Sequence, residues 1–171
     1  MKALIVTDMQ QVITDFKDFG PIEDRISQLI NLYRDQGHKV IFTKHISQNP
    51  EDHFYFDKPQ VGISCKVYQE GDLVIEKLSP SVFKETDLDA ILKEADIKDL
   101  TFVGFNTEFC CLFSAVAAYD RGYQVTFVED AIGTCNDAET YEMPGLDIND
   151  FVGTFLDWSG VVRVEYTEDL L

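Results

Sequence analysis

The chain has 171 residues, of which 45% are hydrophobic and 26% are charged, and its formal net charge is −17. This length suits one domain with a sizeable core, and the composition is typical of a soluble globular protein. The strong acidity argues against a nucleic-acid partner and against binding to an anionic membrane surface.

Apolar runs and apolar residues at helical spacing alternate along the whole chain. The runs predict strands at 2–8, 38–44, 72–77, 99–105, 123–130 and 161–166, and the spacing predicts helices at 21–36, 86–96, 107–121 and 147–157. Strands that are apolar throughout and separated by helices indicate a parallel sheet covered on both faces. The predicted fold is therefore α/β, a three-layer α/β/α sandwich with a central, mainly parallel six-stranded sheet in a single domain over residues 1–171.

The cysteines and the apolar runs bear on the location of the protein. Four cysteines in a chain of this size, at positions 65, 110, 111 and 135, do not suggest a disulfide scaffold, so we expect a reducing, cytoplasmic environment. The first apolar run is short and is interrupted by Asp8, and no run approaches transmembrane length. We therefore expect neither a signal peptide nor a membrane partner.

Three chemically distinct residues follow the predicted strands. Right-handed crossovers place all the strand carboxyl ends at one edge of a parallel sheet, and ligands bind there, where the strand order reverses. Asp8 follows the first strand, Lys77 ends the third, and Cys110 lies at the start of the helix after the fourth. Taken singly, these are ordinary turn, surface and core residues; taken together, they place an acid, a base and a thiol at one edge.

This combination suits acyl transfer without a histidine. A helix N-terminus and a nearby ammonium favour the thiolate, so we expect a lowered pKa for Cys110. Asp8 can take the thiol proton and later protonate a departing amine. Backbone N–H groups at the helix start can hold an oxyanion.

Three segments of the sequence resemble a known family: ALIVTDMQ, EKLSPSVFKETDLDAIL and VGFNTEFCCLFSAVAAYDRGYQVTFVEDAIGT. Over nearly its whole length the chain is similar to the isochorismatase-like cysteine hydrolases, which include nicotinamidases and N-carbamoylsarcosine amidase. The resemblance implies that Asp8, Lys77 and Cys110 form the catalytic triad. It also implies that Cys111, at a usually aliphatic position, serves packing.

The resemblance has further implications for the site. It implies an oxyanion hole built from the backbone N–H groups of Asn106 and Cys110, and a cis peptide bond between Phe105 and Asn106. Phe16 and Phe83 are candidates for substrate binding, because Phe83 lies in a segment that resembles one lining the family's site. Aromatic residues within 53–56 are further candidates, although core packing is the ordinary role of such residues.

The region TKHISQNPEDHFYF departs from the metal site of nicotinamidases. Those enzymes carry an Asp-x-His step, whereas Asp52 and His53 are adjacent here and would point to opposite sides of an extended chain. We therefore expect no metal and no other cofactor, although His45, His53 and Asp52 leave a metal site open as an alternative.

The predicted function is that of a cysteine hydrolase which cleaves an amide-type C–N bond of a small molecule through a thioester. Three alternatives stay open: an isochorismatase-type vinyl ether hydrolase, a metal-dependent nicotinamidase, and a catalytically silent binding or assembly protein. The expected partners are a small-molecule substrate and further copies of the same chain in a homo-oligomer. No nucleic acid is expected.

Overall fold

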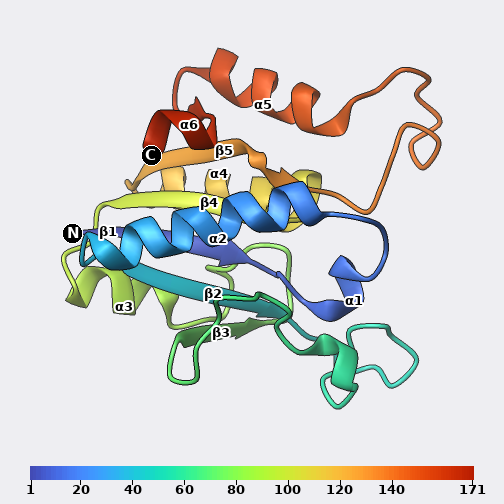
Figure 1. The fold of residues 1–171 in the computed structure, drawn as a ribbon, viewed down its shortest axis with the longest axis horizontal. Coiled ribbons are helices and arrows are strands. Elements are labelled where there is room, and N and C mark those ends of the chain that lie inside the picture. The colour runs from blue at the N-terminus through green and yellow to red at the C-terminus, as the bar shows by residue number, and fades with distance from the viewer.

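The computed structural model describes residues 1–171 and contains one six-stranded parallel sheet (Figure 1). Its strands are β1 (Lys2–Thr7), β2 (Lys39–His45), β3 (Leu73–Lys77), β4 (Asp99–Phe105), β5 (Gln124–Gly133) and β6 (Arg163–Glu165). They lie in the order β3-β2-β1-β4-β5-β6, and every neighbouring pair is parallel. The predicted sheet is therefore confirmed.

Eight helical segments connect the strands. They are α1 (Gln11–Thr14), α2 (Gly20–Asp35), η1 (Pro59–Val61), α3 (Leu88–Glu94), η2 (Thr107–Cys111), α4 (Leu112–Asp120), α5 (Ile148–Ser159) and α6 (Thr167–Leu170). The four predicted helices are present, but the predicted helix at 107–121 begins with the π-helical turn η2 before it continues as α4. The short segments α1, η1 and α6 were not predicted.

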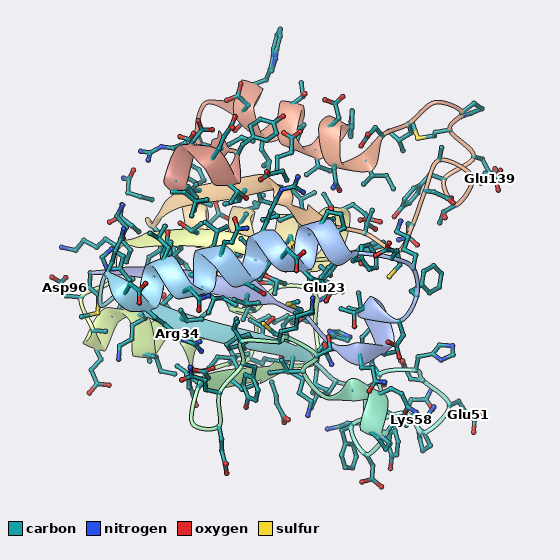
Figure 2. All side chains as sticks on the ribbon, viewed as in Figure 1. Glu23, Arg34, Glu51, Lys58, Asp96 and Glu139 are labelled. Carbon is teal, nitrogen blue, oxygen red and sulfur yellow. The ribbon has the colours of Figure 1, made fainter.

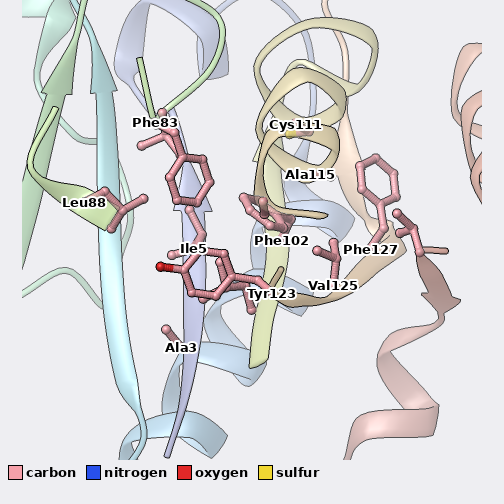
Figure 3. Packing of buried hydrophobic residues seen from close by; sticks show 14 of the residues in the cluster. Ala3, Ile5, Phe83, Leu88, Phe102, Cys111, Ala115, Tyr123, Val125 and Phe127 are labelled. Atoms are coloured by element: carbon pink, nitrogen blue, oxygen red, sulfur yellow. The ribbon is translucent and has the colours of Figure 1, made fainter. Parts of the chain in front are cut away.

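Alternation along the strands builds the three layers. In β1, Ala3 and Ile5 face a hydrophobic cluster that also contains residues of α3, α4 and α5 (Figure 3). Leu4 and Val6 point to the opposite face, where the cluster contains residues of α2. Because all four side chains are fully buried, β1 is central to the sandwich and is covered on both sides.

The order of the strands reverses between β1 and β4, which creates a crevice at their carboxyl ends. At this point Thr7 pairs with Gly104, whose φ is 114°. A Cβ at Gly104 would lie 2.1 Å from the Thr7 carbonyl oxygen, so only glycine lets the two strands approach this closely. This contact sets the distance between the residues that follow β1 and those that follow β4.

Two long connections extend from the carboxyl edge of the sheet (Figure 1). The connection after β2 carries Glu51 and Lys58, and the connection after β5 carries Glu139 (Figure 2). None of the helices is both long and apolar enough to span a membrane.

Candidate active site

Asp8 follows β1 directly and is fully buried, with a φ of 45° in the left-handed region. Thr43 of β2 fixes it twice: its hydroxyl accepts the Asp8 N–H at 3.0 Å and donates to Asp8 Oδ1 at 2.5 Å. The second carboxylate oxygen, Oδ2, is thereby left to face the neighbouring strand end.

Lys77 ends β3 and is 2% exposed, which is unusual for an ammonium. Its Nζ lies 2.7 Å from Asp8 Oδ2 and 3.2 Å from Cys110 Sγ, and it donates to the Ser79 carbonyl oxygen at 3.1 Å. The structure therefore brings the three predicted residues together from β1, β3 and η2. Burial alone lowers the pKa of Lys77, but Asp8 and then Cys110 outweigh burial, so its pKa lies above the usual value.

The resting state of Cys110 differs from the expectation. Burial, and after it the charge of Asp8, raises the pKa of the Cys110 thiol to about 12, while Lys77 opposes this only in part. The prediction of a lowered pKa is therefore wrong, because it counted the ammonium and the helix start and left out burial and the carboxylate. The free site holds a thiol, and the carboxylate of Asp8 lies within 4.8 Å of its sulfur.

Cys110 and Cys111 point in different directions, as expected for adjacent positions of a helix. Cys110 is partly exposed and contacts Lys77. Cys111 is fully buried in the hydrophobic cluster with Ala115 (Figure 3). The interpretation of Cys111 as a packing residue is confirmed.

The expected cis peptide bond between Phe105 and Asn106 lies directly before η2. The Asn106 carbonyl oxygen accepts the N–H groups of Phe109 and Cys111, each at 3.2 Å. Its side-chain Oδ1 accepts the Cys135 N–H at 3.1 Å, so Asn106 is fixed to the end of β5. Asn106 and Cys110 thus flank the first turn, where an oxyanion hole was predicted.

Three residues that the sequence did not single out support this site, Gln10, Thr43 and Ser79, and so does His45, which the sequence suggested only as a possible metal ligand. Gln10 is fully buried, and its amide bridges His45 and the segment before β3. Thr43 and His45 lie in the run TKH at the end of β2, so the rule that points to residues at strand ends would have found them. Ser79 contributes only its backbone carbonyl, for which no side-chain pattern exists.

One cluster of ligand-type atoms includes a histidine. Asp8, His45 and Cys110 each present one such atom, all within 4.8 Å of one another. The Lys77 ammonium contacts all three, so a protein cation already occupies this position. His53 is exposed on the loop, and Asp52 accepts the Phe54 N–H at 2.8 Å, so the pair does not join His45 in this cluster.

The two predicted substrate-binding residues lie in different surroundings. Phe83 is 5% exposed and stacks on Tyr123 with ring centroids 5.8 Å apart (Figure 3). The Arg121 guanidinium covers its ring at 4.9 Å. The structure thus places Phe83 in the hydrophobic core, and its role in substrate binding stays a prediction. Phe16 is 67% exposed on the loop between α1 and α2. In the 53–56 stretch, the Phe54 ring packs edge-on against His45 at 5.1 Å.

A surface cavity of about 470 Å³ lies beyond β5, between the starts of α2 and α5. Its lining includes Lys17, Asp18, Thr134 and Asn149 but none of Asp8, Lys77 and Cys110. The reactive groups therefore do not line this cavity.

Comparison with known proteins identifies the family of the chain. The model of the isochorismatase domain family matches residues 2–158. The chain belongs to the isochorismatase family. The match covers β1 to β5 with their helices, and the chain is a hydrolase of that family.

Curated relatives include Nicotinamidase 3 from Arabidopsis thaliana, 28% identical over 149 residues, which are 79% of this chain and 74% of the relative. The uncharacterized isochorismatase family protein YrdC of Bacillus subtilis is 28% identical over 138 residues, which are 76% of this chain and 72% of the relative. Both relatives thus align with more than three quarters of this chain.

Solved structures of the family share the fold. A hydrolase of the isochorismatase family from Chromobacterium violaceum superposes with a TM-score of 0.85 and 24% identity, covering 99% of this chain and 91% of that one. Nicotinamidase PncA from Bacillus subtilis superposes with a TM-score of 0.78 and 22% identity, covering 96% and 98%. The α/β/α architecture is thus the fold of these hydrolases.

Proposed function

We propose that this isochorismatase-family hydrolase cleaves the C–N bond of a small amide through a thioester on Cys110. The observation that carries the proposal is the contact of one buried ammonium, Lys77 Nζ, with both Asp8 and Cys110, at 2.7 Å and 3.2 Å. A charged pair buried to this degree is energetically unfavourable unless every partner is in place, and such perturbed groups gather at functional sites.

The thiol pKa of about 12 determines the order of events in this proposal. The sulfur loses its proton to Asp8 as it attacks the amide carbon, so that no free thiolate has to accumulate. The developing oxyanion accepts the N–H groups of Asn106 and Cys110. The carbonyl then re-forms, the C–N bond breaks, and Asp8 returns its proton to the amine.

Hydrolysis of the thioester completes the cycle. Asp8, now ionised, takes a proton from water as the water oxygen attacks the thioester carbon. The C–S bond breaks, the sulfur receives the proton held by Asp8, and the acid leaves. Throughout both halves Lys77 stays cationic and balances the negative charge that moves between Asp8 and Cys110.

The substrate class follows from the relatives and from the site together. Nicotinamidases among the relatives and structural neighbours favour a planar primary amide. Phe54 beside His45 and the exposed Phe16 are candidates to contact such a ring. Phe83 is left out of this proposal because it lies in the core.

Intact-mass analysis after rapid acid quench tests the proposal. The enzyme is mixed with a panel of small amides, with nicotinamide among them, and we expect a mass increase equal to the acyl group on wild-type protein. The increase should be missing from the Cys110→Ala variant and present on Cys111→Ala. Turnover with no adduct on any amide, or an adduct that survives Cys110→Ala, contradicts the thioester mechanism.

We also infer a cytoplasmic homo-oligomer that works without a metal. The four cysteines are free thiols, which suits a reducing compartment. Large apolar side chains are exposed on neighbouring helices, with Phe113 on α4 at 52%, and Phe155 and Trp158 on α5 at 53% and 86%. Sedimentation of wild type and Phe155→Glu tests the assembly, and a monomeric wild type would contradict the inferred oligomer.

Turnover after exhaustive chelation tests whether the enzyme needs a metal. Loss of activity that zinc restores would contradict the inference that it works without one.

A further inference from the structure

The Lys77 ammonium has more hydrogen-bond acceptors than hydrogens. Four acceptors surround Nζ: Asp8 Oδ2 at 2.7 Å, the Ser79 carbonyl oxygen at 3.1 Å, Cys110 Sγ at 3.2 Å and His45 Nδ1 at 3.4 Å. An ammonium carries three N–H groups. Asp8 and Ser79 provide the two shortest oxygen contacts, so the sulfur and the imidazole compete for the third N–H.

The state of the sulfur decides this competition. We propose that His45 is a positioning residue that accepts the third N–H of Lys77 whenever Cys110 cannot. This inference rests on the proposed function, because the sulfur becomes a poor acceptor when it is acylated in the thioester. His45 then keeps the ammonium fully bonded and in place beside Asp8 while water attacks.

The position of His45 is fixed by contacts to its backbone and to its ring. Gln10 accepts the His45 N–H at 2.8 Å and donates to the His45 carbonyl oxygen at 3.0 Å. The same Gln10 amide donates to the Val61 carbonyl oxygen at 2.7 Å, which ties the end of β2 to η1. Phe54 packs edge-on against the imidazole at 5.1 Å and 89°. The ring is therefore held where Nδ1 faces Lys77.

The charge state of His45 suits an acceptor. Burial, and after it the charge of Lys77, lowers the pKa of His45 below its usual value, so the ring is neutral at neutral pH. The charged or titratable groups that face it are Asp8, Asp52, Lys77 and Cys110. Asp8, a hydrogen bond with the Ser79 backbone and Asp52 raise the pKa of His45, but they only partly offset the lowering. Because an ammonium can only donate, contact with Nδ1 requires the ring proton on Nε2.

A double-mutant cycle tests the inference without any substrate. Cys110→Ala alone leaves three acceptors for Lys77, and so does His45→Leu alone; the double variant leaves two and a buried N–H without a partner. If the two single substitutions acted independently, their shifts in melting temperature would add. We expect the double variant to melt about 2–4 °C or more below that additive value. Additive melting temperatures would overturn the inference.

His45→Asn is the matched control, since its side-chain oxygen offers an acceptor near the position of Nδ1 without a titrating ring. With Asn at position 45, adding Cys110→Ala should lower the melting temperature by no more than Cys110→Ala does alone. If Asn behaves like Leu, the ring serves packing and the inference is wrong. This control also decides the question if the double variant with Leu fails to fold.

Kinetics on an amide that forms the adduct provide a second measurement. In His45→Leu, hydrolysis of the thioester should slow about tenfold more than its formation, so the acylated fraction at steady state should rise. In His45→Asn, the acylated fraction should return to the wild-type value. Equal slowing of both steps would contradict the inference. If wild type forms no adduct at all, the proposed function fails, and the melting cycle still decides the role of His45.

Discussion

Two polar networks flank the η2 turn, and each is built around one charged side chain. In the first, the Lys77 ammonium has four acceptors and is closed from solvent. In the second, Glu108 Oε1 accepts from Thr134 at 3.0 Å, Asn136 at 2.7 Å and Tyr141 at 2.8 Å. Cys110 and Glu108, both in η2, thus belong to opposite arrangements. Cys110 is one of several acceptors around a cation, whereas Glu108 provides one carboxylate oxygen that accepts from three donors.

The difference between the networks teaches what makes one of them reactive. The Lys77 network contains a nucleophile and a base, and it has one acceptor too many, so its bonds can rearrange as the sulfur changes state. The Glu108 network contains only donors to one oxygen, while the second oxygen, Oε2, is buried without a partner. It fastens the connection after β5 to the start of η2, and it offers no group that could attack a substrate.

Removal of the nucleophile or the base gives the largest expected effect. Cys110→Ala and Asp8→Asn should each lower kcat/KM on the order of 10³-fold or more, since a catalytic unit of this kind fails when one member is lost. The measurement is steady-state hydrolysis of an amide that forms the adduct. Glu108→Gln, in the other network, is the control and should retain most of the activity. Substantial turnover by either of the first two variants would refute the mechanism.

The second effect is on stability. Lys77→Met leaves Asp8 buried without its cation, and removal of one partner from a buried ion pair typically costs about 3–5 kcal/mol. Urea denaturation followed by circular dichroism measures the loss. Lys44→Met is the matched control, because its pair with Glu76 at 3.1 Å lies at the surface, and such pairs contribute about 0–1 kcal/mol. Equal stability of the two variants would show that the Lys77 network is no tighter than a surface pair.

Much of this arrangement could be predicted from the sequence because parallel sheets obey simple rules. Apolar runs located the six strands, and three residues at or after their carboxyl ends, Asp8, Lys77 and Cys110, do meet at one edge. The strand order β3-β2-β1-β4-β5-β6 explains why, since it reverses between the strands that precede Asp8 and Cys110.

The rest depends on distances that a sequence does not contain. The pKa of Cys110 reflects burial and the charge of Asp8 more than the nearby ammonium, and neither the burial nor the separation could be inferred from spacing. Phe83 follows Lys77 closely in the chain, yet its ring packs against Tyr123 in the core. The contact of His45 with Lys77 requires the register of β2 against β3, which pairs these two residues directly.

The ionisation of Cys110 sharpens the comparison further. With a pKa of about 12, the thiol should add no thiolate absorbance in the ultraviolet at neutral pH, so wild type and Cys110→Ala should have the same absorbance there. Asp8→Asn removes an anion that raises this pKa and should therefore shift the thiolate signal to lower pH. A thiolate signal from Cys110 in the wild type at neutral pH would contradict the buried-thiol description.

Alkylation compares the two adjacent thiols directly. Iodoacetamide should modify Cys110 well ahead of Cys111, because Cys111 is fully buried and burial raises its pKa well above the usual value. Peptide mapping after partial modification identifies the site. Earlier modification of Cys111 would reverse the assignment of the two residues.

The smallest expected effect lies in the second network. Tyr141→Phe removes a hydroxyl that donates to Glu108 Oε1 at 2.8 Å but leaves Thr134 and Asn136 bonded to the same oxygen. The free energy of unfolding should fall by about 0.5–1.5 kcal/mol, the usual contribution of one hydrogen bond. Hydrogen exchange should speed up in residues 134–147 and stay unchanged at the end of β3, because the two networks share no side chain. Faster exchange around Lys77 in this variant would show that the networks are coupled through η2, and the separation drawn between them would not hold.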